Sequence, residues 1–343
     1  MRDSIIYATI RSFFVAVFSI IGIFVGLIPA ILLLVWAVSS SEKEPENYYS
    51  YEIVPNADGS RKVLSSDAPV VLKININGII GLNDLTGSSF RQLLVESREG
   101  DLKNDRVKAL LLHINTPGGT LVDANGIYHA LEAYKERYKV PVYAFVDGLC
   151  ASGGMYVACA ADKIFANDVS LIGSVGVILP SFLNFTETMD KVGVKALTLF
   201  AGKGKDDMDP LRPWKPGEEV NLQSITNYYY EHFVNLVSKS RPAIEREKLV
   251  EQYGAKVFPA EEAQKYGYID AGNYTYNQAL KELVKKIGIE DQYYQVVQLE
   301  NKSWFSSLFK GEFDLLKGHI THQIQMTPLD AKMQNQVLYL YQP

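Results

Sequence analysis

The sequence offers little material for disulfide bonds, because its 343 residues include two cysteines, Cys150 and Cys159. Small exported domains that depend on disulfides usually carry at least two bridges. If both cysteines lay on one helix, the rise along its axis would separate them by roughly 13 Å, too far for a bridge. The sequence therefore excludes a disulfide framework and predicts two buried free thiols.

A surplus of basic residues is also missing. Lysine and arginine total 34 against 39 aspartates and glutamates, for a net charge of -5. Domains that bind nucleic acid usually carry a basic surplus, so we expect no nucleic-acid partner. There is no CxxC pair and no histidine-rich spacing, and we predict neither a metal site nor a cofactor.

Charge is absent from one long segment near the N-terminus, Ser12 to Val38, whose 27 residues include no Asp, Glu, Lys, Arg or His. About 20 apolar residues span a bilayer as a helix, whereas the apolar part of a cleaved signal has about 7 to 15. An uncleaved transmembrane anchor over 12–38 is therefore the favoured interpretation. Cleavage after Ala37 or Ser39 is the alternative.

The flanks of this segment differ in charge. Two arginines lie within residues 1–11, while glutamates dominate the residues after the span. The basic flank is expected to stay in the cytoplasm, which places residues 1–11 inside and the bulk of the chain outside. The polar, tyrosine-rich segment 39–67 contains several turn-forming residues and is predicted to be a linker.

From residue 68 to about 290, short apolar runs alternate with helical patterns. Such alternation predicts an α/β fold with buried, largely parallel strands. The predicted strands are Val70–Ile76, Val107–Ile114, Val142–Val146 and Lys163–Ala166, and the predicted helices are 88–97, 121–138, 151–161, 223–239 and 277–286. Residues 291–343 show no clear period and are assigned to a C-terminal extension.

Two of the predicted strand ends carry glycines. The segment INTPGG ends the second strand with Gly118 and Gly119, whose amides could hold the oxyanion formed on a substrate carbonyl. For this motif alone, a plain strand-to-helix turn explains the glycines equally well. The third strand leads into Ala151-Ser152-Gly153-Gly154 and a helix. Ser152 is then either a helix N-cap or a nucleophile near the positive end of the helix dipole, with the Gly153 amide beside it.

A serine nucleophile needs a base, and histidine is scarce around Ser152. The five histidines are His113, His129, His232, His319 and His322, so none lies between residues 130 and 231. A Ser-His-Asp triad has no support from the spacing. A lysine is the alternative base, provided that its surroundings leave the amine neutral.

Several blocks together resemble the bacterial signal peptide peptidase A family in its short form, which is peptidase family S49. They are INTPGG (114–119), DGLCASGGMYVACAADKIFA (147–166), IGSVGVI (172–178), AGKGKDDMDP (201–210) and VFPAEEAQKYGYIDA (257–271). The resemblance implies a fold of the Clp-protease and crotonase-like superfamily, a superhelix of repeated β-β-α units. It also implies a Ser-Lys dyad, with Ser152 as nucleophile, Lys205 as base and Ser174 orienting the lysine amine. Lys203 is the rival base, because Gly204 departs from the family's usual aromatic or histidine.

The resemblance further implies a peptidase that cuts cleaved signal peptides and other short or unfolded peptides on the outer face of a bacterial inner membrane. It implies a homo-oligomeric ring, in which Ser152 and Lys205 meet either within one chain or between chains. Two other classes of function remain open on the residues alone. One is a crotonase-like acyl-CoA enzyme, and the other is a catalytically silent membrane scaffold that binds peptides.

Overall fold

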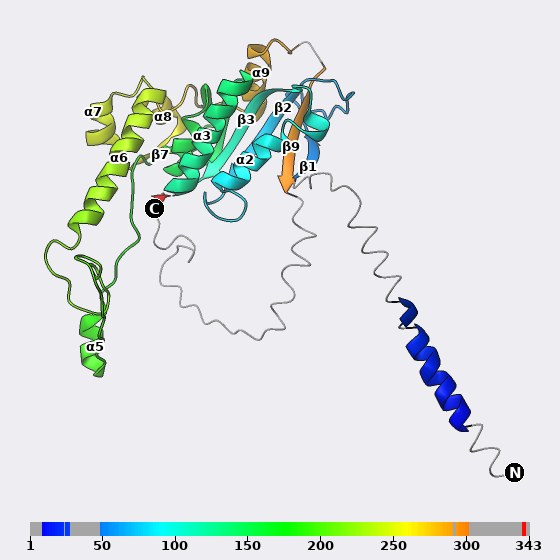
Figure 1. Ribbon diagram of the computed structural model, residues 1–343. Coiled ribbons are helices and arrows are strands. Elements are labelled where there is room, and N and C mark those ends of the chain that lie inside the picture. Colours follow the sequence, from blue (N-terminus) through cyan, green and yellow to red (C-terminus); the bar gives the residue numbers. More distant parts are fainter. Residues whose placement is uncertain (1–8, 24, 28–48, 291–292, 302–337, 341–343) are drawn as a thin grey trace. The chain divides into compact units, whose positions relative to one another are not determined.

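The computed structural model describes residues 9–23, 25–27, 49–290, 293–301 and 338–340 (Figure 1). The chain divides into two units, residues 1–48 and 49–343. In the first unit, Thr9–Leu27 forms a helix that is long and apolar enough to cross a membrane. The remainder of the predicted span, residues 28–38, lies outside the described residues.

Among its described residues, the second unit forms an eight-stranded sheet and a separate two-stranded one. Its strands are β1 (Tyr49–Val54), β2 (Val70–Asn77), β3 (Val107–Thr116), β4 (Gly118–Thr120), β5 (Val142–Ala151), β6 (Lys163–Ala166), β7 (Leu171–Gly173), β8 (Val257–Pro259), β9 (Gln295–Asn301) and β10 (Leu338–Leu340).

The helices follow the strands along most of the chain. They are α2 (Gly87–Glu96), α3 (Leu121–Tyr138), α4 (Gly153–Ala158), α5 (Thr186–Val192), α6 (Val220–Ser240), α7 (Arg246–Lys248), α8 (Ala260–Tyr266) and α9 (Tyr276–Lys286), with a 3-10 turn at Gly100–Leu102 and a π-helical turn at Leu249–Tyr253. In Figure 1, α2 and α3 lie side by side across one face of the sheet.

The large sheet has the order β1-β9-β2-β3-β5-β7-β8 and is mixed. Its central strands β9, β2, β3, β5 and β7 run parallel, and β1 and β8 add antiparallel edges. Strand β5 changes its neighbour along its length, because Tyr143–Val146 pairs with β6 and Leu149–Ala151 pairs with β7. This change of neighbour carries the end of β5 away from the first part of the sheet.

Alternating side chains of the central strands fill two cores, one on each face of the sheet. On β3, Leu110 and Leu112 enter the core covered by α2, α3 and α4, while Ala109 and Leu111 enter the core covered by α9. Both faces are thus apolar, as expected of strands covered by helices on both sides. Each fully buried Leu or Ile side chain contributes about 1.5 to 3 kcal/mol of transfer free energy.

Most predicted elements match the structure, but some boundaries differ. Strand β1 lies inside the segment 39–67 that was predicted to be a linker, and β9 lies inside the predicted extension 291–343. The two strands pair with each other, with Tyr51 opposite Leu299. Tyrosines and β-branched residues suit strands, so the composition taken for a linker instead supplies the edge of the sheet.

A second difference concerns the end of β5, which continues through Ala151, where a helix was predicted to begin. Cys150 therefore lies on a strand and Cys159 follows α4, so the premise that one helix holds both is wrong. Both are buried free cysteines, as predicted.

Candidate active site

Ser152 occupies the sharp turn between β5 and α4. Its backbone has φ 53° and ψ −114°, a conformation that residues other than glycine rarely adopt. Neighbouring groups hold it there, because its amide donates to Gly173 O at 3.0 Å and its carbonyl accepts from Tyr156 N at 3.0 Å. Such a backbone costs of order 1 to 3 kcal/mol and is common at functional sites.

The hydroxyl of Ser152 does not cap the helix that follows it. Thr120 at the start of α3 and Thr275 at the start of α9 each accept a backbone N–H at 3.2 and 3.3 Å, as N-caps usually do. Ser152 stands at the corresponding place before α4 but makes no such bond. Its Oγ is buried and has no hydrogen-bond partner among the described residues, and the residue is 1% exposed. The helix-cap interpretation is therefore wrong for this hydroxyl.

Strand β4 forms one lip of the site. It is held against Ile80, whose amide donates to Gly118 O at 2.8 Å and whose carbonyl accepts from Thr120 N at 2.9 Å. Since backbone groups alternate sides along a strand, the polar groups of Gly119 face the opposite way. A Cβ at Gly119 would lie 1.9 Å from Ile80 O, so no side chain fits there.

The open side of β4 accepts another strand. Antiparallel β10 pairs with it, with Tyr339 opposite Gly119 and Leu340 opposite Gly118. This edge is therefore able to hydrogen-bond an extended peptide segment. Of the two predicted oxyanion amides on β4, that of Gly118 instead donates to Thr116 Oγ1 at 3.0 Å, whereas that of Gly119 points toward β10.

Helix α4 lies close to the end of β3 because it begins with two glycines. A Cβ at Gly154 would come within 2.5 Å of Thr116 Cγ2, so only glycine permits this approach. The first amides of a helix have no acceptor within the helix. The Gly153 amide, at the first position of α4, therefore stands beside Ser152 and near the glycines of β4.

The end of β5 before Ser152 is braced by residues for which the sequence predicted no role. Asn115 Oδ1 accepts from Leu149 N at 3.1 Å, and Ser170 Oγ accepts from Gly148 N at 3.1 Å. Asp147 Oδ1 accepts from Asn167 Nδ2 at 2.7 Å, which adds a further contact at this point of the chain. Asn115 stands in the INTPGG block, so its position at a strand end was the available signal.

Ser174 lies just beyond β7, the strand that pairs with the end of β5. Gly173 is opposite Ala151 in that pairing, so Ser174 and Ser152 follow two paired residues. Ser174 is buried, has φ 57°, and donates its amide to Lys256 O at 2.7 Å. Ser152, Gly153, Ser174 and the β4 glycines thus gather at the same end of neighbouring strands.

Lys205 does not join this group within one chain. It lies in the segment 177–219, called the arm here, which contains α5 and extends beyond the sheet in Figure 1. Lys205 and its rival Lys203 are both exposed, and the Lys205 amide bonds locally to Gly202 O at 3.3 Å. The unpartnered Ser152 Oγ therefore receives no bond from either lysine in the described chain.

The arm exposes a series of large apolar side chains. Leu197 and Leu199 are 84% and 86% exposed, and no residue of α5 is buried. The other exposed large apolar residues of the arm are Ile178, Phe182, Leu183, Phe185, Val192, Val194, Phe200 and Leu211. An exposed apolar surface of this kind usually marks an interaction site.

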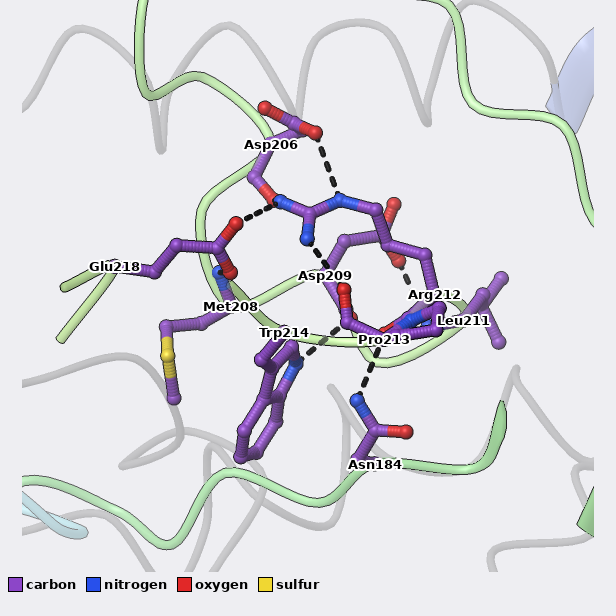
Figure 2. A network of polar contacts seen from close by, with 9 residues as sticks. All are labelled: Asn184, Asp206, Met208, Asp209, Leu211, Arg212, Pro213, Trp214 and Glu218. Atoms are coloured by element: carbon purple, nitrogen blue, oxygen red, sulfur yellow. Dashed lines mark hydrogen bonds and ion pairs between the residues drawn. The ribbon is translucent and has the colours of Figure 1, made fainter. Parts of the chain in front are cut away.

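One polar cluster orders the end of the arm (Figure 2). The Arg212 guanidinium donates to Asp206 Oδ2 at 2.8 Å, to Asp206 O at 2.5 Å and to Glu218 Oε1 at 2.6 Å. The side chains of Asp206 and Glu218 are 8% and 6% exposed. The bond from Arg212 holds the pKa of Glu218 below its usual range.

Other cysteines and histidines of the fold are poorly suited to act in place of Ser152 as nucleophile or of a lysine as base. Burial raises the pKa of the Cys150 thiol, and it raises that of Cys159 to about 12, so both thiols stay protonated near neutral pH. Burial, followed by the charge of Lys73, lowers the pKa of His113, which contacts Asp147 at 3.3 Å. His232 contacts the Tyr156 hydroxyl at 3.1 Å, so neither histidine serves Ser152 Oγ.

A strained serine at a strand-to-helix turn, facing a glycine-lined strand edge, is the arrangement of a serine hydrolase. Comparison with known proteins also gives a class of peptidases. The sequence matches peptidase family S49 over residues 134–301 and the Clp protease family over residues 86–170. The first match contains Ser152, Ser174 and Lys205, and the second contains the β4 glycines.

Curated relatives give the same family. The chain is 31% identical over 233 residues to a candidate signal peptide peptidase SppA of Enterococcus faecium, with 64% of each chain covered. It is 32% identical over 219 residues to a candidate protease of Methanocaldococcus jannaschii, with 63% of this chain and 68% of the relative covered. A candidate protease of Synechocystis is 34% identical over 169 residues, with 49% and 60% covered.

The chain therefore belongs to peptidase family S49, with a Clp-protease-like fold. It spans about two thirds of the length of the first two of these curated relatives.

Proposed function

We propose that the protein is a membrane-anchored serine endopeptidase in which Ser152 is the nucleophile and Lys205 the base. The observation that carries this proposal is the Ser152 hydroxyl itself. It is buried in a strained turn, does not cap its helix, and has no partner in the described chain. A hydroxyl held in this way at an energetic cost is suited to reaction rather than to stabilising the fold.

In the proposed mechanism, the neutral Lys205 amine takes the proton of Ser152 Oγ as the oxygen attacks a peptide carbonyl. The Gly119 and Gly153 amides hold the oxyanion, since the Gly118 amide is engaged by Thr116. The tetrahedral intermediate then collapses as the lysine ammonium protonates the leaving amine. Water, activated by the same amine, hydrolyses the acyl-enzyme and restores Ser152. Ser174 orients the amine.

Because a single chain leaves Lys205 exposed and away from Ser152, the dyad is proposed to form between neighbouring copies in a homo-oligomeric ring. The apolar side chains of the arm support this assembly. Burying them against a second copy would be favourable by about 25 cal/mol per Å² of apolar surface removed from water, before the cost of association. The assembly would complete each site.

Substrates are proposed to be cleaved signal peptides and other short or unfolded peptides. The pairing of β10 with β4 supports this class, because the same edge would bind a substrate as an added antiparallel strand. The apolar helix Thr9–Leu27 supports attachment to the inner membrane, with residues 1–11 in the cytoplasm and the peptidase outside. An enzyme held at the bilayer meets membrane-embedded peptides at a high effective concentration.

The test is hydrolysis of an internally quenched, unfolded peptide by the full chain in detergent. Ser152→Ala and Lys205→Ala should each lower kcat by about 1,000-fold or more, because both remove a member of the reacting pair. Lys203→Ala, with its similarly exposed amine, is the matched control and should retain activity. Full activity in Ser152→Ala would disprove the nucleophile, and loss confined to Lys203→Ala would move the base to that residue.

A further inference from the structure

Arg212 ties the segment that carries Lys205 to the body of the fold. Asp206 follows Lys205 directly, and Arg212 holds both its carboxylate and its carbonyl oxygen. The same guanidinium donates to the Pro213 carbonyl at 2.8 Å and to Glu218. One side chain thus makes four bonds, and two of them fix the residue next to the proposed base.

The other end of this cluster lies next to helix α6, which packs into the core. Glu218 lies two residues before α6, and its second oxygen accepts from Met208 N at 3.2 Å. Helix α6 is anchored in the core by the fully buried Phe233, Val234 and Val237. The chain of contacts from the core through α6, Glu218 and Arg212 to Asp206 therefore ends one residue from Lys205.

Two further bonds join the cluster to the residues just before α5. Asn184 Nδ2 donates to Arg212 O at 2.8 Å, and Phe185 N donates to Pro210 O at 2.8 Å. Trp214 Nε1 closes the loop by donating to Asp209 O at 2.9 Å (Figure 2). Hydrogen bonds and ion pairs consequently connect residues 206–218 with one another and with residues 184 and 185. Many apolar side chains of the arm are instead exposed.

Ordinary surface ion pairs in this protein look different. Arg246 and Glu231 also form an arginine–carboxylate contact, but their side chains are 51% and 52% exposed. Exposed pairs contribute little to stability. Arg212 instead binds two largely buried carboxylates in a segment with few buried apolar side chains, so its bonds contribute to setting the local backbone.

We infer that Arg212 is a positioning residue that sets the direction in which Lys205 is presented to Ser152. The inference rests on the proposed function, since it takes Lys205 as the base. Proton transfer requires the amine within hydrogen-bond reach of the hydroxyl, and a displacement of 1 Å can cost about 100-fold in rate. A lysine ammonium at position 212 has no planar fork and would satisfy fewer of the four acceptors.

The experiment is a double-mutant cycle between Arg212 and Lys205 in the full chain, with a p-nitrophenyl ester as the substrate that acylates Ser152. An activated ester leaves a measurable rate in the absence of the base. Arg212→Gln should lower kcat about 10- to 100-fold with little change in KM. Arg212→Lys should lose less activity than Arg212→Gln, and the control Arg246→Gln should behave as the unmodified chain.

The decisive measurement is Arg212→Gln in the Lys205→Ala background. If Arg212 acts through Lys205, the second substitution costs nothing further, because the base it positions is already gone. A merely structural role would lower the rate again by a similar factor, which would overturn the inference. Circular dichroism and size-exclusion chromatography identify any variant that fails to fold or assemble, and Asp206→Asn then replaces Arg212→Gln in the cycle with the same two outcomes.

Failure of the proposed function has a different signature. If Lys205→Ala alone keeps full activity, the base assignment is wrong, and the positioning role falls with it. If Lys205→Ala is inactive on peptides but the cycle is additive, only the inference about Arg212 is wrong.

Discussion

The strand ends around Ser152 and the arm around Lys205 are built in opposite ways. Ser152 lies among buried residues of β5, α4 and β7, and its backbone is fixed by bonds to two neighbouring elements. The arm exposes its apolar side chains and contains the Arg212 cluster with its two largely buried carboxylates. The difference indicates that a single chain completes the surroundings of the proposed nucleophile but not those of the proposed base.

The largest expected effect tests whether the two halves come from different chains. Ser152→Ala and Lys205→Ala are each expected to be inactive. Co-expressing them with different tags should restore about a quarter of the activity, because a head-to-tail ring of mixed chains pairs an intact serine with an intact neighbouring lysine at that frequency. The measurement is peptide hydrolysis by the doubly purified mixture. An inactive mixture that has assembled normally would place both halves in one chain.

The second prediction concerns the exposed surface of the arm. Replacing Leu197 and Leu199 together by Asp should prevent assembly, since two charges cannot be buried without partners, and should lower activity by about 1,000-fold, as loss of the base does. Analytical ultracentrifugation and peptide hydrolysis measure the two effects. The control is Val169→Asp, at an exposed apolar residue outside the arm. Full assembly of the double variant would show that this surface is not an interface.

The third prediction compares the stability of the two regions. Leu112→Ala removes a fully buried side chain in the core and should lower the free energy of unfolding by about 2 to 5 kcal/mol. Leu199→Ala should change it by less than about 0.5 kcal/mol, because that side chain is exposed in a single chain. Denaturant unfolding of single chains checks this difference. A large loss in Leu199→Ala would mean that the arm packs on the core.

The smallest expected effect is a difference between the two regions in how their stability depends on pH. The pKa of His113 is lowered by burial, so the unfolded state binds more protons and stability falls as the pH drops below about 6.5. The pKa of Glu218 is lowered by Arg212, so its stabilisation holds above about pH 4.3 and is lost only below it. As the pH is lowered from 7 to 5.5 and then to 4, the strands near His113 should lose protection from hydrogen exchange first. The arm should lose its protection only at pH 4.

His113→Gln is the control for this ordering. It should remove the change between pH 7 and 5.5 and leave the change at pH 4. Loosening of the arm at pH 5.5 would contradict the assignment.

Much of the central sheet could be predicted from the sequence, because its strands and helices carry strong local patterns. The predicted helix 121–138 and strand 163–166 match α3 and β6 residue for residue. The edge formed by β1 and β9 could not be predicted in this way. Its two strands are nearly 250 residues apart, and their pairing depends on tertiary contacts that no local pattern contains.

For the candidate site, the sequence could identify some residues but not their contacts in the fold. The ASGG block pointed to Ser152, but the missing cap bond and the positive φ depend on Gly173, which only the folded sheet brings alongside. The role of Arg212 was hidden for the same reason. In sequence it is one charge among many near Lys205, and its four acceptors become apparent only when the chain turns back on itself.

The backbone conformation of Ser152 also implies a trade-off between the stability of the fold and its activity. Glycine adopts positive φ without the steric penalty of a side chain, so Ser152→Gly should be more stable than the unmodified chain by about 1 kcal/mol while lacking the proposed nucleophile. Selection for a sturdier fold alone would thus remove the serine. The same property makes Ser152→Gly the preferred variant for capturing an uncut peptide on the edge of β4.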